Sequence, residues 1–104
     1  MIEHEAKLCL EIASQRILVY IKNKPDSTIT KIHLGLKITY AHTSRLMRVL
    51  DGKGLLQIQK TGRCSFIGLS KKGLYIADMY DEIHSLLGIE EEYKVLDKLK
   101  DMEV

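Results

Sequence analysis

The sequence has little of what marks several broad classes of protein. Its 104 residues include one proline and seven glycines, and 45% are apolar and 29% charged, which is typical of a globular chain and not of a disordered or collagen-like one. No apolar run approaches the roughly 18 residues that a membrane-spanning helix needs, so we expect no integral membrane protein. The first residues are acidic where a secretory signal is basic, so we expect a cytoplasmic protein.

Motifs that carry chemistry are also scarce. The two cysteines, Cys9 and Cys64, lie far apart in the chain and give no disulfide framework, so reduced thiols are expected. No His or Cys pair has metal-ligand spacing, and there is no glycine-rich phosphate loop or activated nucleophile. The sequence therefore predicts no metal site, no cofactor and no enzyme activity, and leaves open whether Cys64 is redox-active.

The charges are unevenly distributed along the chain. Residues 31–72 contain nine basic side chains and a single acidic one, Asp51, which gives this segment a net charge of +8. Residues 78–104 contain nine acidic residues and three lysines, a net charge of −6, and the first 30 residues are neutral. The middle of the chain is therefore predicted to face a polyanion, and the alternative is an ordinary solvated surface.

Hydrophobic periodicity predicts helices in the first half of the chain. Apolar residues recur at three- and four-residue spacing over residues 6–21, which predicts one helix ending at residues 23–25, although a division near residues 14–15 stays open. Residues 26–28 supply helix-capping side chains for a short second helix. The residues of that helix that are expected to point inward are Ile29, Ile32 and Leu36.

A third helix is predicted after a turn at residues 37–39. Thr39 is well placed to cap it, and Gly54 ends it after about residue 53. Its inner face is expected to hold Thr43, Leu46, Met47 and Leu50. The remaining face carries Tyr40, Ala41, His42, Ser44, Arg45 and Arg48.

The period then changes from helical to two. Residues 55–60 and 64–69 alternate as strands do, and the turn at residues 61–63 joins them into a hairpin. Ser70 is placed to cap a fourth helix that Gly88 interrupts, with a stripe of Ile76, Met79, Tyr80, Ile83 and Leu87. In the last segment, residues 89–104, the three glutamates at residues 90–92 are predicted to be the exposed first turn of a helix. Its own stripe comprises Ile89, Tyr93, Leu96, Leu99, Lys100 and Val104.

This order of elements predicts an α+β, mainly α fold: a winged helix-turn-helix, with a three-helix core and a β-hairpin wing. We expect one domain over residues 1–104, with its core at about residues 15–80. The N-terminal helix and the helices of residues 70–104 are predicted to form a homodimer, because a narrow apolar band edged by charges suits paired helices. The alternative is that the last helix folds back over its own domain.

The segment from Ile29 to Gly73 resembles the winged helix-turn-helix of MarR-like prokaryotic transcriptional regulators. The matching features are Ser44-Arg45, the run Leu-Asp-Gly-Lys-Gly-Leu at residues 50–55, the Gly-Arg turn at residues 62–63 and the closing Leu-Ser-Lys-Lys-Gly at residues 69–73. The resemblance covers roughly residues 15–80. It implies a dimer with the third helix in the DNA major groove and the wing tip in the flanking minor groove.

The chain departs from the family in two respects. Lys37 stands in the helix-turn-helix turn where the family often has a glycine with positive φ, a backbone conformation that is uncommon for other residues, so a reshaped turn is expected. The chain is also shorter than typical members, so a small-molecule effector is possible but not indicated.

Physical reasoning assigns roles to the basic residues. A helix fits the major groove, and an outward arginine such as Arg45 or Arg48 can pair with guanine, which discriminates bases by roughly 1–3 kcal/mol. Their alternatives are phosphate contacts or an ion pair with Asp51. Arg63 at the wing tip is predicted to enter a narrow minor groove, which attracts arginine electrostatically. The alternative is a soluble turn residue that only prevents aggregation at the strand edge. The predicted DNA-contacting residues are Thr39, Tyr40, Ala41, His42, Ser44, Arg45, Arg48, Lys60, Arg63 and Lys71.

The sequence therefore predicts a sequence-specific, DNA-binding transcriptional regulator that acts as a homodimeric repressor by occluding its site. Its partners would be double-stranded DNA and a second copy of itself. The alternative is a winged-helix protein–protein interaction module or adaptor without DNA sequence specificity, because a fold does not fix a function. Within the helix, Tyr40 could instead pack on Ile38, and His42 could be an ordinary solvated residue.

Overall fold

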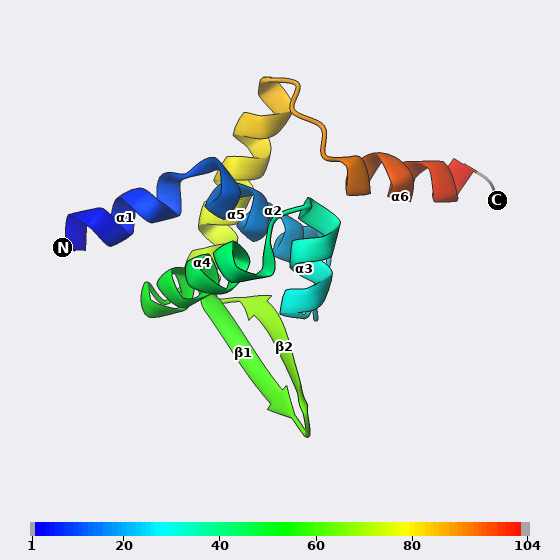
Figure 1. Cartoon of the computed structure of the whole chain (residues 1–104). Coiled ribbons are helices and arrows are strands. Elements are labelled where there is room, and N and C mark those ends of the chain that lie inside the picture. The colour runs from blue at the N-terminus through cyan, green and yellow to red at the C-terminus, as the bar shows by residue number, and fades with distance from the viewer. Residues whose placement is uncertain (1, 103–104) are drawn as a thin grey trace.

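The predicted winged helix-turn-helix fold is confirmed by the structure, a computed structural model that describes residues 2–102, with the backbone alone at residues 2, 3, 97, 98 and 100–102. Six helices form the body of the described chain, and the two-stranded wing projects from it, on the side away from the C-terminal end of α5 (Figure 1). In chain order the elements are α1 (Ile2–Leu10), α2 (Ile12–Asn23), α3 (Ile29–Leu36), α4 (Tyr40–Gly52), β1 (Leu56–Thr61), β2 (Cys64–Leu69), α5 (Lys71–Leu86) and α6 (Glu92–Met102).

Helix α2 lies at the centre of the core. Five consecutive residues from Ile17 to Ile21 are all buried, so this part of the helix is apolar on every side, which is typical of a helix enclosed by other elements. It packs against α3, α5 and β2. The core is completed by Ile32, Leu36, Leu46, Leu50, Leu55, Leu56, Ile67 and Ala77.

The prediction of one helix over residues 6–21 is wrong: the segment is divided, as the open alternative allowed, but the break lies at Glu11 and not near residues 14–15. Glu11 has extended backbone angles, φ −63° and ψ 150°, and Ser14 Oγ donates to the Leu8 carbonyl at 2.6 Å across the break. A single extended residue changes the phase of the apolar pattern too little to be seen in the sequence. The break turns α1 away from α2 and lets it pack on α4.

The helix-turn-helix is formed by α3 and α4, and threonines cap both helices. Thr28 Oγ1 accepts from Lys31 N, and Thr39 Oγ1 accepts from His42 N, each at 3.2 Å, which confirms the predicted start of α4. Lys37 between the helices has φ 59° and ψ 42°, so it adopts the left-handed conformation directly. The turn is therefore not reshaped by the absence of glycine, and Ile38 N closes it on the His33 carbonyl at 3.1 Å.

The wing is an antiparallel hairpin whose base is held by the core. Its register runs from Leu56 opposite Leu69 to Thr61 opposite Cys64, and Gly62 at the turn has a φ of +63°. Leu56 and Ile67 are buried at the base, whereas the strand residues toward the tip are mostly exposed. Ile67 N also donates to the Ser27 carbonyl at 2.7 Å, so the wing is fastened to the loop before α3.

The predicted apolar stripe of α5 is not the face that packs on the core. Met79, Ile83 and Leu87 are exposed, and only Ile76 and Tyr80 of that stripe are half-buried. The buried residues of α5 are Gly73, Ala77 and His84. Small residues face the core here because α5 approaches its neighbours closely, and the His84 ring is accommodated by a hydrogen bond between its Nε2 and Gln15 Oε1 at 2.9 Å.

Helix α6 leaves the body of the molecule, in the direction opposite to α1 (Figure 1). Tyr93 in its first turn is buried against Tyr20, with ring centroids 4.8 Å apart. Further along, Leu96 and Leu99 are half exposed, so among the described residues only the first turn of α6 covers α2. Val104 and the side chain of Lys100, both placed in the predicted stripe, lie outside the described residues.

None of the helices within residues 2–102 is at once long enough and apolar enough to span a lipid bilayer.

Candidate nucleic-acid interface

Helix α4 presents its polar face to solvent because its apolar face is fully used in the core. Thr43, Leu46, Met47 and Leu50 are all buried, as predicted from their spacing. The position of the helix start is fixed as well, because Thr43 Oγ1 donates to the Thr39 carbonyl at 2.8 Å. Of the predicted contact residues, Thr39, Tyr40, Ala41, Arg45 and Arg48 are exposed, and His42 and Ser44 are half-buried.

The orientation of Tyr40 is set by α3. Its ring meets the His33 ring edge to face, with centroids 5.5 Å apart and an interplanar angle of 88°. His33 is itself held by its Nδ1 at 3.2 Å from the Ile38 carbonyl. Tyr40 is still 53% exposed, so its outer part remains free to meet a ligand. The supporting role of His33 was missed, and no signal in the sequence pairs these two residues.

A groove of about 490 Å³ lies between α4 and the wing. Ser44 and Arg48 line it from α4, and Lys60 lines it from β1, so three predicted contact residues from two separate elements meet here. The floor is apolar, and the two cations stand with one carboxylate, Asp51. The other lining residues are Ile29, Met47, Ile58, Ser65 and Ile67.

The structure bears on the alternative that Arg45 or Arg48 forms an ion pair with Asp51. Within the described part of the chain, none of the ion pairs joins Arg48 or Arg45 to Asp51, although Asp51 and Arg48 line the same groove. Both side chains are exposed. The arginines of α4 therefore present their guanidinium groups outward instead of to a neighbouring carboxylate.

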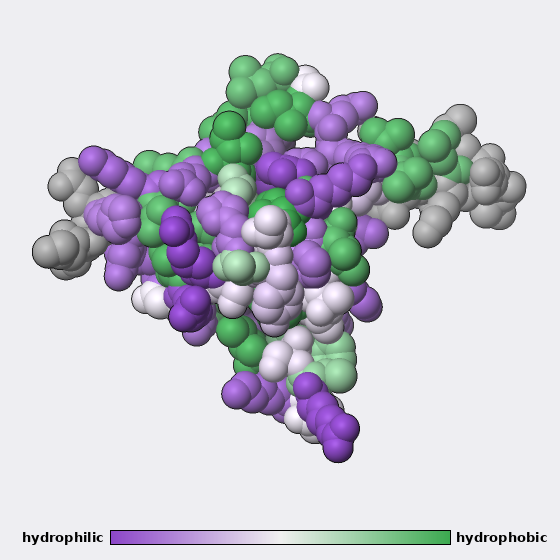
Figure 2. Space-filling model, in the orientation of Figure 1, coloured by the Kyte–Doolittle hydropathy of each residue, from purple (hydrophilic) through white to green (hydrophobic). Residues whose placement is uncertain are grey.

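The wing carries the remaining cations of the interface. Lys60 is opposite Ser65 in the hairpin, and Arg63 follows Gly62 at the turn. The Lys60 and Arg63 side chains are both exposed. Figure 2 shows that the projecting end of the wing is strongly hydrophilic. An arginine on such a narrow projection can enter a groove that a helix is too wide to enter.

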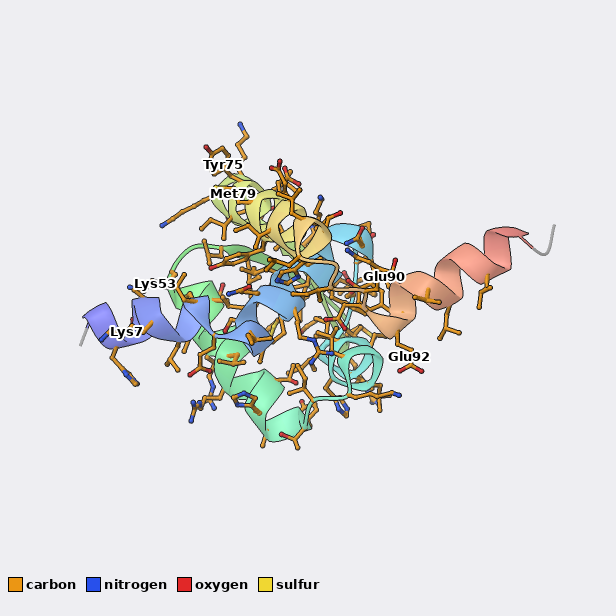
Figure 3. The ribbon with its side chains drawn as sticks, turned by 90° about the horizontal axis from the view of Figure 1, so that it is seen from above. Lys7, Lys53, Tyr75, Met79, Glu90 and Glu92 are labelled. Atoms are coloured by element: carbon orange, nitrogen blue, oxygen red, sulfur yellow. The ribbon has the colours of Figure 1, made fainter. Side chains whose placement is uncertain are left out.

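Lys71 and Lys72 at the start of α5 differ in their surroundings. Lys71 is exposed, whereas Lys72 Nζ donates to the Lys53 carbonyl at 3.3 Å and helps to hold the base of the wing. Lys53 in turn has its Nζ 3.9 Å from a carboxylate oxygen of Glu5 on α1, and Figure 3 shows Lys53 beside α1. Only Lys71 of these lysines is thus left uncommitted among the described contacts.

Neither cysteine is among the predicted contact residues of this interface. Cys64 is exposed at the first position of β2, and Cys9 is half-buried on α1. Burial raises the pKa of the Cys9 thiol, which disfavours its reactive thiolate form. Over the described residues, no group of three or more His, Cys, Asp or Glu side chains could hold a metal ion.

The chain is similar in structure to several solved proteins. AF1382 from Archaeoglobus fulgidus superimposes with a TM-score of 0.68 at 20% identity, covering 78% of this chain and 93% of that one. MepR, a transcription regulator of the Staphylococcus aureus multidrug efflux pump MepA, gives 0.66 at 19% identity, covering 97% and 86%. Streptococcus pneumoniae FabT, solved in complex with DNA, gives 0.62 at 17% identity, covering 98% and 81%.

The sequence by itself gives no such match: no family model matches the chain, and neither does any curated protein. The shared feature is thus the three-dimensional arrangement, helix-turn-helix and wing together. The resemblance of residues 29–73 to MarR-like regulators is consistent with it. This chain has the winged helix-turn-helix fold, which it shares with these solved proteins, the transcription regulator MepR among them.

Proposed function

We propose that this protein is a sequence-specific, DNA-binding transcriptional regulator that places α4 in the major groove and the wing in the adjacent minor groove. The observation that carries the proposal is the groove between α4 and the wing, where Arg48 and Lys60 meet. DNA as the ligand is supported by FabT, which resembles this chain in structure and was solved in complex with DNA. The dense positive charge of residues 31–72 supplies the attraction to phosphate.

The groove has a specific role in this arrangement. If α4 occupies the major groove and the wing the neighbouring minor groove, the strand backbone between these grooves must pass between the two elements. A sugar–phosphate backbone alternates apolar and anionic parts, which suits a groove with Met47 and Ile58 in its lining and Arg48 and Lys60 beside them. We therefore assign Arg48 and Lys60 to phosphates and Arg45 to a base edge.

We further propose that the regulator is a homodimer. The accessible surface is 7186 Å², whereas a folded monomer of this mass exposes about 5,900 Å². The excess includes large apolar side chains on or next to α1, α5 and α6, and Figure 3 shows Tyr75 and Met79 pointing away from the body. The most exposed of these apolar residues are Leu10, Ile12, Tyr75, Leu86, Leu87 and Leu96.

A twofold dimer would present two α4 helices to one face of a duplex. Half-sites about 34 Å apart would then be read by the two copies, and the bound dimer would occlude a promoter that overlaps its site. Repression by occlusion is therefore the mode of action that we propose.

The test is a binding titration on duplexes selected from random oligonucleotides, repeated over a salt series. Phosphate neutralisation releases counterions, so the affinity is expected to fall linearly with salt on a double logarithmic scale. The variant with both Arg45→Ala and Arg48→Ala should lose the selected site. Absence of binding at low salt, or an affinity that is independent of salt, would contradict the proposal and favour an adaptor that binds protein.

A further inference from the structure

Arg16 and Glu91 join the segment before α6 to the end of α3. Arg16 Nε lies 2.6 Å from Glu91 Oε1 and Arg16 Nη2 lies 3.0 Å from Glu91 Oε2, so the guanidinium grips the carboxylate with two nitrogens. The Arg16 and Glu91 side chains are 27% and 13% exposed. The prediction that the three glutamates are an exposed turn is therefore wrong for Glu91, because a partner 75 positions away covers it.

The same guanidinium reaches the helix-turn-helix turn. Arg16 Nη2 also donates to the Leu36 carbonyl at 2.8 Å. Leu36 is the last residue of α3, where helix carbonyls have no partner within the helix. The residue that follows it, Lys37, has the left-handed conformation, which a non-glycine residue keeps only where its surroundings hold it. The carboxylate of Glu91 thus orients the group that satisfies the end of α3.

The two residues after Glu91 reinforce the attachment. Lys37 Nζ pairs with Glu92 Oε2 at 2.6 Å, although both side chains are well exposed and such pairs contribute little. Tyr93 packs on Tyr20, whose ring lies so close to Gly35 that a Cβ there would be 2.7 Å from it. Three consecutive residues therefore contact α3 or the α2 surface beneath it, and in Figure 3 Glu92 lies on the α3 side of α6.

We propose that Arg16 and Glu91 are positioning residues for DNA recognition: their ion pair fixes the turn between α3 and α4 and thereby the angle at which α4 meets the duplex. This inference rests on the function proposed above. It also gives α6 a second role. The helix that exposes Leu96 and Leu99 for the proposed dimer contact is attached, just before its first residue, to the helix-turn-helix.

The variant Glu91→Gln tests the proposal, and Glu92→Gln is its matched control, since each removes one negative charge from adjacent positions. Glu91→Gln is expected to weaken binding to the selected duplex about tenfold, while binding to unrelated duplex and the salt slope stay unchanged. Glu92→Gln should stay within about twofold of the parent for the selected duplex.

Arg16→Lys should match Glu91→Gln, because lysine keeps the charge but cannot bridge carboxylate and carbonyl at once. The double variant should lose no more than either single variant. Equal losses for Glu91→Gln and Glu92→Gln, or a Glu91→Gln protein that binds the selected duplex as the parent does, would overturn the proposal. So would a parallel loss for both kinds of duplex, since that would indicate general destabilisation.

Amide hydrogen exchange without DNA separates this inference from the proposed function. The Ile38 and Lys37 amides close the turn on the His33 and Leu34 carbonyls. In Glu91→Gln they should exchange at least about tenfold faster, with no such change in Glu92→Gln. A parent protein that binds no DNA would overturn the proposed function, and unchanged exchange in Glu91→Gln would overturn the positioning role.

Discussion

Gly73, at the start of α5, lies directly against the carbonyl of Leu55, at the entry to the wing. A Cβ at position 73 would lie 1.9 Å from that oxygen, which already accepts a hydrogen bond from Ser70 N at 3.0 Å. Ser70 Oγ completes the junction by donating to the Gly54 carbonyl at 2.6 Å and accepting from Gly73 N at 3.0 Å. The direction of the wing relative to α5 is therefore fixed by backbone in contact with backbone.

Replacement of Gly73 by alanine should consequently destabilise the fold. The methyl group meets main-chain atoms that cannot rotate away, so we expect a loss of about 3 kcal/mol or more in the free energy of unfolding, measured by urea titration. Gly52→Ala is the control, because a Cβ at Gly52, in the last turn of α4, meets nothing within 4 Å. That variant should gain up to about 1 kcal/mol. Similar unfolding midpoints for the two variants would contradict the close contact.

This junction also illustrates what could be read from the sequence. The caps at Thr39 and Ser70, the buried face of α4 and the hairpin all follow from spacings of two to four residues, and each is confirmed. The glycine at position 73 was visible as part of a motif. Its purpose, however, depends on the approach of Leu55, which only the folded chain reveals.

The predictions that the structure contradicts concern residues whose partners are distant in the sequence. Local spacing could not tell which side of α5 faces inward, because the choice depends on how closely Gly73 and Ala77 let it approach its neighbours. Glu91 looked like an ordinary solvated acid for the same reason, since Arg16 lies in a different helix. Of the candidate site, α4 and the wing were predictable as separate elements, but the groove between them was not.

The carboxylate of Asp81 should make stability depend on acidity. Lys22 Nζ lies 2.8 Å and Lys94 Nζ 2.7 Å from its two oxygens. Burial acts to raise the pKa of Asp81, but the hydrogen bonds and charges of the two lysines outweigh it, so the pKa falls below its usual 3.8. The ionised form is thus favoured by folding, and this contribution is present above pH 3.8 and lost as the pH falls toward the lower folded value.

Asp81→Asn should therefore lower the free energy of unfolding by about 1 kcal/mol at pH 7, with the difference from the parent shrinking as the pH drops below 3.8. Urea titrations at several pH values measure this. Asp78→Asn is the matched control, because among the described side chains Asp78 pairs only with Lys22 and is itself 55% exposed, so a smaller change is expected. A loss for Asp81→Asn that persists unchanged in acid would refute the assignment.

The proposed dimer can be tested on side chains that do not contribute to the core. Leu86 is 80% exposed and Leu96 52% exposed, so glutamate at either position should fold normally but place a charge in the interface. Both variants are expected to sediment as monomers at concentrations where the parent is a dimer. Leu34→Glu on α3, where the leucine is 64% exposed, is the control and should leave the mass unchanged. Dimers of undiminished stability in both variants would exclude these helices from the interface.

The wing tip offers a prediction about DNA shape. Arg63 stands at the turn beside Gly62 and is free to enter a minor groove. Narrow A·T-rich grooves concentrate negative potential, so Arg63→Ala should weaken binding several-fold more for A·T-rich flanks than for G·C-rich flanks of the same site. Lys60→Ala, further down the same wing, should weaken both alike because we assign it to a phosphate. Equal sensitivity of Arg63→Ala to the two flanks would argue against entry into the minor groove.

The two arginines of α4 should respond differently to lysine. We assign Arg45 to a base edge, where the planar guanidinium is needed, so Arg45→Lys should keep the salt slope and lose about 1–3 kcal/mol of discrimination at one base pair. We assign Arg48 to the backbone beside Lys60, so Arg48→Lys should bind nearly as the parent does, whereas Arg48→Ala should weaken all duplexes and lower the salt slope by about one unit. Titrations against the selected site and its single-base variants measure both effects. If Arg48→Lys relaxed the preference for a base and Arg45→Lys did not, the two assignments would have to be exchanged.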